Sequence, residues 1–235
     1  MTPQQQPLFT PETEWVPPTS LPDLSGYSEI AIDLETRDPN LITMGSGSVR
    51  GDGEIVGIAV AVEGWSGYFP INHEGGGNMD RALVLDWFEE ILNTTSTKIF
   101  HNAMYDVSWI RSLGFYINGG IVDTMIAASL IDENRFSYTL DSVSKDYIGM
   151  RKNESILKQA AEDFNVNPKA EMWKLPSPFV GKYAEKDAEM TLKLWHALQH
   201  EISKQDLWHI FNFCLLYTSD AADERSSVDL GGRRI

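Results

Sequence analysis

The sequence has little cysteine and no long hydrophobic segment. Its 235 residues include one cysteine, Cys214, which excludes a disulfide framework and a zinc site built on cysteines. The longest uncharged apolar run, residues 55–62, is too short to cross a bilayer. Residues 1–6 lack the basic-then-apolar layout of a signal peptide. We therefore expect a protein with no membrane segment, located in the cytoplasm (the host cytoplasm if a phage encodes it).

Positive charge is also scarce. The chain has 19 Lys and Arg against 34 Asp and Glu, which gives a net charge of −15. This charge excludes a protein that coats nucleic acid by bulk attraction. It leaves open a metal-dependent site, because hard divalent cations are bound by carboxylates. Hydrophobic residues make up 42% of the chain and charged residues 23%, so the sequence can build a sizeable core.

The first part of the chain predicts an arm followed by three strands. Residues 1–27 are rich in Pro, Gln, Thr and Glu without periodicity, which is typical of an extended N-terminal arm. The periodic part, residues 28–213, is expected to form one domain. It begins with strands over residues 29–36, 55–62 and 65–72, whose short connections favour antiparallel pairing. The glycine-rich segment 45–53 predicts a loop.

After residue 78 the hydrophobic spacing becomes helical. Short strands are expected over residues 98–100 and 121–122. Helices are expected over residues 80–93 (with Asp80 as its cap), 102–113, 124–131, 140–148, 154–164 and 180 to about 211. We therefore predict an α/β domain whose mixed β-sheet, three antiparallel strands and then parallel additions, is flanked by helices.

The last 22 residues, 214–235, break this pattern. They resemble the conceptual translation of a transposon-derived sequencing adapter joined to a truncated reading frame. We therefore expect the native sequence to be interrupted near Phe213 and residues 214–235 to be non-native. A genuine polar tail is the alternative. Resequencing the source DNA with a different library chemistry distinguishes the two, because only a genuine tail would be recovered.

Three pairs of polar residues have spacings that place both members on one face of an element. They are Asp33 with Glu35, Asn102 with Asp106, and Tyr183 with Asp187. The first pair is two residues apart on a predicted strand, and the other two are four residues apart on predicted helices. If the pairs converge, their carboxylates repel one another unless cations bind among them. Two hard divalent ions with oxygen ligands would remove this repulsion.

Each pair taken alone also has an ordinary structural explanation. The D-x-E spacing recurs at Asp187 and Glu189, so an acidic chain produces it easily. Asp33 and Glu35 could be solvated carboxylates at a strand end, and Asn102 could be a helix cap. The combination is more specific. The N-x3-D and Y-x3-D spacings each occur once in the chain, and the pairs follow in the order strand, helix, late helix.

On these residues the sequence resembles the DEDDy 3′–5′ exonucleases of the RNase H-like superfamily. Within them it is most similar to the proofreading domain of family A (Pol I-like) DNA polymerases of phages and bacteria. Residues 99–102, 123–125 and 138–143 add support, with the letters IFHN, DTM and YTLDSV. Lys182 stands where the sister DEDDh group has histidine, which favours the tyrosine subgroup. The resemblance covers about residues 27–213 and implies an RNase H-like fold.

The resemblance also implies a role for each acidic residue. Asp33 would bridge two divalent cations, Mg²⁺ or Mn²⁺. Glu35 and Asp187 would complete the ligation of the ion that holds the attacking water, and Asp106 would reach the other ion through water. Tyr183 would orient the nucleophilic water. Paired ions of this kind lower the pKa of a bound water and stabilise the leaving oxygen of a displacement at phosphorus.

The implied substrate is the 3′ end of single-stranded or frayed DNA. Leu34 and Thr36 would contact the terminal nucleotide, Asn102 would orient the sugar-phosphate, and Tyr183 would also touch the nucleic acid. The chain would be the proofreading module of a polymerase whose C-terminal polymerase domain is missing here. Two alternatives stay open: an RNase D-like RNA exonuclease, and an inactive exonuclease-like domain that only holds nucleic acid or a polymerase.

Overall fold

A computed structural model describes residues 13–214 of the chain. Residues 1–12 of the predicted arm lie outside the described residues. So does the predicted non-native tail, apart from Cys214. Within the described range, no helix is both long enough and apolar enough to cross a bilayer.

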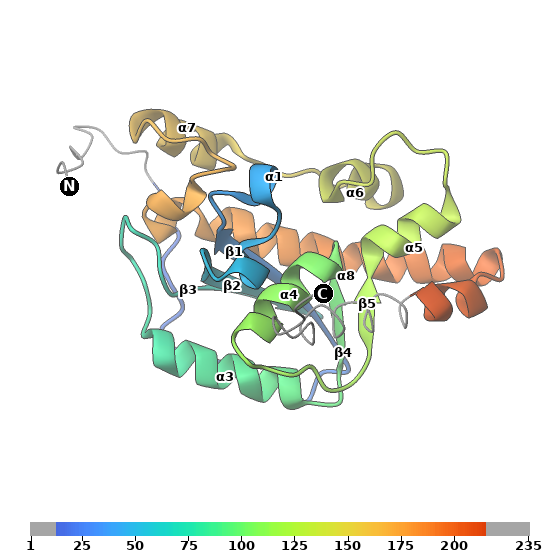
Figure 1. Cartoon of the computed structure of the whole chain (residues 1–235). Helices are drawn as coiled ribbons and strands as arrows, with labels where there is room; N and C mark the ends of the chain where they lie inside the picture. Colours follow the sequence, from blue (N-terminus) through green and yellow to red (C-terminus); the bar gives the residue numbers. More distant parts are fainter. Residues whose placement is uncertain (1–12, 215–235) are drawn as a thin grey trace, which may run out of the picture.

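Five strands form one mixed sheet in the order β3-β2-β1-β4-β5 (Figure 1). The strands are β1 (Glu29–Arg37), β2 (Glu54–Val62), β3 (Trp65–Pro70), β4 (Thr97–Phe100) and β5 (Ile121–Asp123). The first three pair antiparallel, and β4 and β5 add to β1 in parallel. The predicted mixed sheet is therefore confirmed.

Helices cover both faces of this sheet because its central strand is apolar on both sides. On one face of β1, Ile30 and Ile32 belong to a cluster with residues of α3 and α4. On the other face, Ala31 packs with residues of α5 to α8. The helices are α1 (Leu41–Met44), α2 (Gly47–Arg50), α3 (Arg81–Asn93), α4 (Ala103–Ser112), α5 (Thr124–Ile131), α6 (Leu140–Ile148), α7 (Ser155–Asp163) and α8 (Gly181–Lys204). Two 3₁₀ turns precede α8: η1 (Met172–Lys174) and η2 (Ser177–Phe179).

The segment predicted as a loop, residues 45–53, contains the short helix α2, so that prediction is wrong in part. The Ser46 side chain accepts from the Ser48 backbone N–H and caps this helix. Arg50 then forms ion pairs with Asp38 and Asp52. These polar contacts within the segment order it, whereas its content of glycine and serine indicates only a lack of regular structure.

The prediction of one continuous helix from residue 180 to about 211 is also wrong in one respect, because the helix is interrupted after Lys204. Asp206 takes a left-handed conformation with φ of 56°. Its N–H bonds the carbonyl of Ser203, and the N–H of Leu207 bonds the carbonyl of Ile202. This is a Schellman ending. Helical structure resumes at residue 208. Hydrophobic spacing does not reveal the break, because aspartate stands where glycine usually marks it.

Residues 13–27 contain no helix or strand, but hydrogen bonds and a buried leucine, Leu24, attach them to the domain. The indole of Trp15 donates to Glu185 on α8 at 2.8 Å. The indole of Trp87 on α3 donates to the carbonyl of Pro22 at 2.7 Å. A Cβ added to Gly181 would collide with the Trp15 ring, so the glycine makes room for it. The boundary near residue 27 stays a prediction.

A buried histidine ties the turn after β3 to the segment before α8. His73 is 3% exposed, and its Nδ1 lies 3.0 Å from the carbonyl oxygen of Leu175. A carbonyl only accepts, so Nδ1 carries the proton and Nε2 accepts from the Tyr68 hydroxyl at 2.6 Å. Burial lowers the pKa of His73 to about 4, which keeps the ring neutral near pH 7.

We expect His73 to make the fold acid-sensitive. Its pKa is about 4 in the folded chain against 6.5 for a freely solvated histidine, so the unfolded chain takes up the proton first on acidification. Stability is therefore lost as the pH falls from about 6.5 towards 4. Between about pH 7 and about pH 5 the loss from this group should be roughly 2 kcal/mol.

Urea titrations with EDTA at these two pH values test this. The His73→Gln variant should lose roughly 2 kcal/mol less of its free energy of unfolding on acidification than the wild type does. Equal losses in the two proteins would contradict the assignment.

Candidate active site

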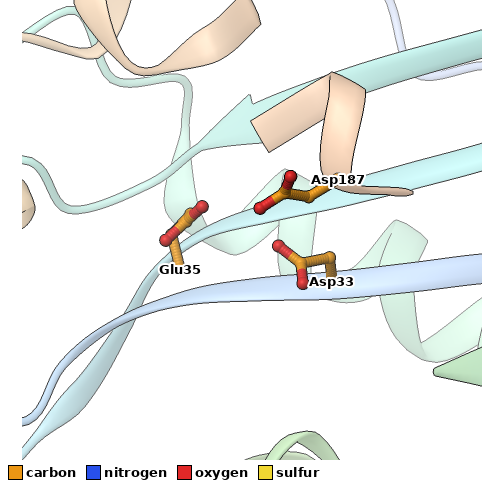
Figure 2. Close-up of side chains that lie close together, drawn as sticks. All are labelled: Asp33, Glu35 and Asp187. Carbon is orange, nitrogen blue, oxygen red and sulfur yellow. The ribbon is translucent and has the colours of Figure 1, made fainter. Parts of the chain in front are cut away.

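Three of the predicted carboxylates meet between β1 and α8 (Figure 2). Asp33 and Glu35 project from the same face of β1, and Asp187 projects from α8, which packs against that face. One oxygen from each of the three lies within 4.8 Å of the other two. In Figure 2 the three carboxyl groups point toward one another, although Asp187 is far from the other two in sequence.

Small side chains allow this close approach. Ala31 and Ala59 form the sheet side of the contact, and Ala184 and Ala188 form the α8 side, with all four buried. A helix packs close to a sheet when the facing side chains are short, so the carboxylates can bridge the remaining gap. The helical spacing that buries Ala184 and Ala188 also turns Asp187 toward β1.

A glycine and a bulge shape the strand next to Glu35. Glu35 pairs with Gly57 of β2, and the register shifts between Glu35 and Thr36. Bulges of this kind redirect side chains and are frequent beside functional sites. A Cβ on Gly57 would collide with the Tyr68 hydroxyl. Gly57 therefore lets the Tyr68 ring lie over β2 while its hydroxyl donates to His73.

Asp106 lies next to these three carboxylates but is held by the backbone. It is buried on α4, and its Oδ1 accepts from the N–H of Leu34 at 3.1 Å. Burial raises its pKa, and the charge of Asp33 raises it further. Asp106 is therefore close enough to Asp33 to interact with it, although it lies outside the three-carboxylate cluster.

Asp123 positions the start of α4, on which Asp106 lies. Its carboxylate accepts from the backbone N–H groups of Asn102, Ala103 and Met125 at 3.0, 2.8 and 2.8 Å. Asn102 has a φ of 69°, and its exposed side chain forms no capping hydrogen bond. Asn102 therefore stands at the N-cap position of α4, as the alternative explanation has it, but its side chain does not cap the helix and its amide group is available at the surface.

Leu34 and Thr36 are placed differently from the carboxylates. The Leu34 side chain is 6% exposed and lies in the cluster on the opposite face of the sheet, so only its backbone lies beside the acidic residues. The Thr36 hydroxyl is 2.6 Å from the Tyr105 hydroxyl. The structure therefore does not bring the Leu34 side chain to the acidic cluster. The predicted contacts of both residues with a nucleotide stay predictions.

The acidic residues hold protons more tightly than free carboxylic acids do. Burial, then the charge of Asp187, raises the pKa of Asp33 to about 7. Burial and the neighbouring Asp33 also raise the pKa of Glu35. Burial and the nearby carboxylates raise the pKa of Tyr183 above its usual value, so its phenol stays protonated and can donate a hydrogen bond.

Lys152 also enters the site, and sequence analysis missed it. Its Nζ lies 2.5 Å from Asp187 Oδ2 and 3.2 Å from the Tyr183 hydroxyl. It comes from the connection between α6 and α7, where its own N–H bonds Asp141 at 2.9 Å. This connection lacks periodicity, and a single lysine there has no spacing that links it to a carboxylate. The sequence therefore offered no signal for it.

The carboxylates of the cluster are suited to a divalent cation. Asp187 Oδ1 is buried and has no hydrogen-bond partner within residues 13–214. In the same range neither the Asp33 nor the Glu35 carboxylate accepts a hydrogen bond. Buried polar atoms are normally paired, so unpaired carboxylate oxygens that converge are what hard cations such as Mg²⁺ and Mn²⁺ bind.

A cleft of about 700 Å³ gives access to the cluster. Its lining includes Glu35, Tyr183, Asp141 on α6 and Lys158 on α7. Lys152 lies in its wall. The lining of the cleft therefore includes Glu35 of the acidic cluster and several basic side chains, a combination that can receive an anionic chain next to bound cations.

Known proteins resemble this chain over most of its length. A 3′–5′ exonuclease family profile matches residues 20–203. The DNA-directed DNA polymerase of Pseudomonas phage M6 is 38% identical over 221 residues, which cover 88% of this chain and 32% of the polymerase. The DNA polymerase DpoZ of Salmonella phage PMBT28 is 30% identical, over 81% of this chain and 29% of that protein. The chain thus spans about a third of the length of these relatives.

Solved structures share the fold at low sequence identity. Brucella melitensis NrnC with bound Mg²⁺ has a TM-score of 0.60 at 17% identity, covering 90% of this chain and 94% of that one. Escherichia coli RNase D has a TM-score of 0.57 at 17% identity, covering 87% and 47%. These neighbours establish the RNase H-like fold predicted from the sequence. The match to the family profile, with the polymerase relatives, places this chain in the 3′–5′ exonuclease family of Pol I-like DNA polymerases.

Proposed function

We propose that this chain removes nucleotides from DNA 3′ ends with two divalent cations, Mg²⁺ or Mn²⁺, and releases 5′-monophosphates. One observation carries the proposal: Asp33, Glu35 and Asp187 converge within 4.8 Å, and a buried oxygen of Asp187 has no partner among the described residues. Carboxylates this close repel one another unless cations bind among them. The exonuclease relatives support the same chemistry.

Each side chain has a distinct task in this proposal. Asp33, Glu35 and Asp187 would hold one ion, and Asp33 with Asp106 would hold the second. When bound, such ions acidify a water and neutralise charge at the reacting phosphate. Tyr183 keeps its proton, so it would donate a hydrogen bond that orients the attacking water and would not remove its proton.

The proposed substrate is a single-stranded or frayed DNA end, and the proposed setting is proofreading. The phage and bacterial relatives are DNA polymerases much longer than this chain, which supports a polymerase domain following the module in the intact protein. Asn102, with its exposed amide, and the backbone at Leu34 and Thr36 would contact the terminal nucleotide. A polymerase module acts where DNA is copied, so we also propose a cytoplasmic location.

We expect Asp33→Ala and Asp187→Ala to abolish degradation of a single-stranded DNA oligonucleotide. Losing a ligand of the ion cluster should cost at least about 10³-fold in rate, or roughly 4 kcal/mol of transition-state stabilisation. Mononucleotide release in Mg²⁺ is the measurement. The control is Asp86→Ala, which removes an exposed carboxylate on α3. Near-wild-type activity in either site variant would refute the site, and an inactive wild type would favour the non-catalytic alternative.

Cation binding should depend on pH because Asp33 holds a proton up to about pH 7. As the pH falls through this value, the proton competes with the ion. Mn²⁺ should therefore bind about tenfold more weakly at about pH 6 than at about pH 8. Calorimetry in buffers of different ionisation enthalpy measures both the affinity and the proton released. Equal affinity at both pH values would contradict this prediction.

The alternative activity within the same fold is that of an RNase D-like exonuclease, which acts on RNA. The likeness to RNase D at 17% identity concerns the fold alone, whereas the phage polymerase is 38% identical. We therefore expect a DNA oligonucleotide to be degraded at least about tenfold faster than an RNA of the same sequence, a difference of about 1.4 kcal/mol. Faster degradation of the RNA would reverse the assignment.

A further inference from the structure

Lys152 supplies a positive charge to the acidic site from outside the three paired motifs. Its side chain is 16% exposed, and its ammonium group contacts both Asp187 and Tyr183. The ammonium also lies 5.0 Å from the centroid of the Tyr183 ring. One lysine therefore contacts both Asp187, which is proposed to hold the ion, and Tyr183, which is proposed to orient the water.

The positive charge of Lys152 offsets part of the repulsion among the carboxylates of the site. Three carboxylates gathered in a largely buried place destabilise the fold when nothing neutralises them. The ammonium group of Lys152 forms an ion pair with Asp187 at 2.5 Å, which places a positive charge beside these carboxylates. Lys152 thus supplies part of the charge that divalent ions would supply.

Other basic residues of the cleft do not share this position. Lys158 also lines the cleft, but it pairs with Glu154 at 2.8 Å. Arg151 lines it too and forms no ion pair with the cluster in the described part of the chain. Within that part, Lys152 is the cation that contacts the cluster.

We propose that Lys152 is a positioning residue that holds Asp187 and Tyr183 in place until divalent ions load, and that loading displaces its ammonium from Asp187. The inference rests on the proposed function, since it concerns the same ion site. The backbone of Lys152 is fixed by its N–H bond to Asp141, so the flexible side chain can leave while the segment stays. Ammonium and metal ion therefore compete for the same carboxylate.

Competition predicts that removing the lysine charge strengthens ion binding. We expect Lys152→Met to bind Mn²⁺ at least tenfold more tightly than the wild type, and Lys152→Arg to stay within about threefold of it. Calorimetry measures the affinity. The rise in Tm on adding Mn²⁺ should also be larger in Lys152→Met than in the wild type. A purely structural lysine predicts the opposite sign, because damage to the site weakens ion binding.

Two further variants make the test specific. Lys158→Met removes the same charge from the same cleft without touching the cluster, so its Mn²⁺ affinity should match the wild type. If Lys152→Met fails to fold by circular dichroism, Lys152→Gln takes its place. Unchanged or weaker Mn²⁺ binding in the neutral variant, with normal binding in the wild type, overturns the role of Lys152. Asp33→Asn lacks a proposed ion ligand and serves as the non-binding reference. If the wild type binds Mn²⁺ no better than this variant, the proposed function is overturned instead.

Discussion

Mutual repulsion among carboxylates is the constraint on which this site depends. Asp33, Glu35 and Asp187 are brought together by the packing of α8, through Ala184 and Ala188, against alanines of β1 and β2. Burial of apolar surface between helix and sheet provides the favourable free energy of folding. This packing holds the acidic groups close together in spite of their repulsion. Burial, and then the neighbouring charge of Asp187, raises the pKa of Asp33, so the negative form of this carboxylate is unfavourable without cations.

The surrounding structure fixes these groups through residues that lie outside the three-carboxylate cluster. Asp123 anchors the start of α4 through the backbone N–H groups of Asn102 and Ala103 and so places Asp106 beside β1. Gly57 leaves room for Tyr68, whose hydroxyl is turned away to His73. A site that must hold several groups in fixed positions needs such support from rigid neighbours.

The paired motifs were predictable because each obeys the period of its own element. Strand alternation predicts that Asp33 and Glu35 share a face, and helical spacing predicts the same for Tyr183 and Asp187. Lys152 was not predictable, because it reaches the site from an irregular connection and its contacts are all distant in sequence. The Schellman ending at Asp206 was missed for a related reason, since no glycine marks it. The exact roles of Leu34, Thr36 and Asn102 depend on a bound nucleotide.

The order of the elements has a consequence for synthesis of the protein. Asp33 lies on the first strand, and Asp187 lies on the last long helix, so the cluster closes only after almost the whole domain has left the ribosome. A nascent or partly folded chain has separated carboxylates and no common ion site. The common ion site of these three carboxylates therefore forms only when the domain is nearly complete.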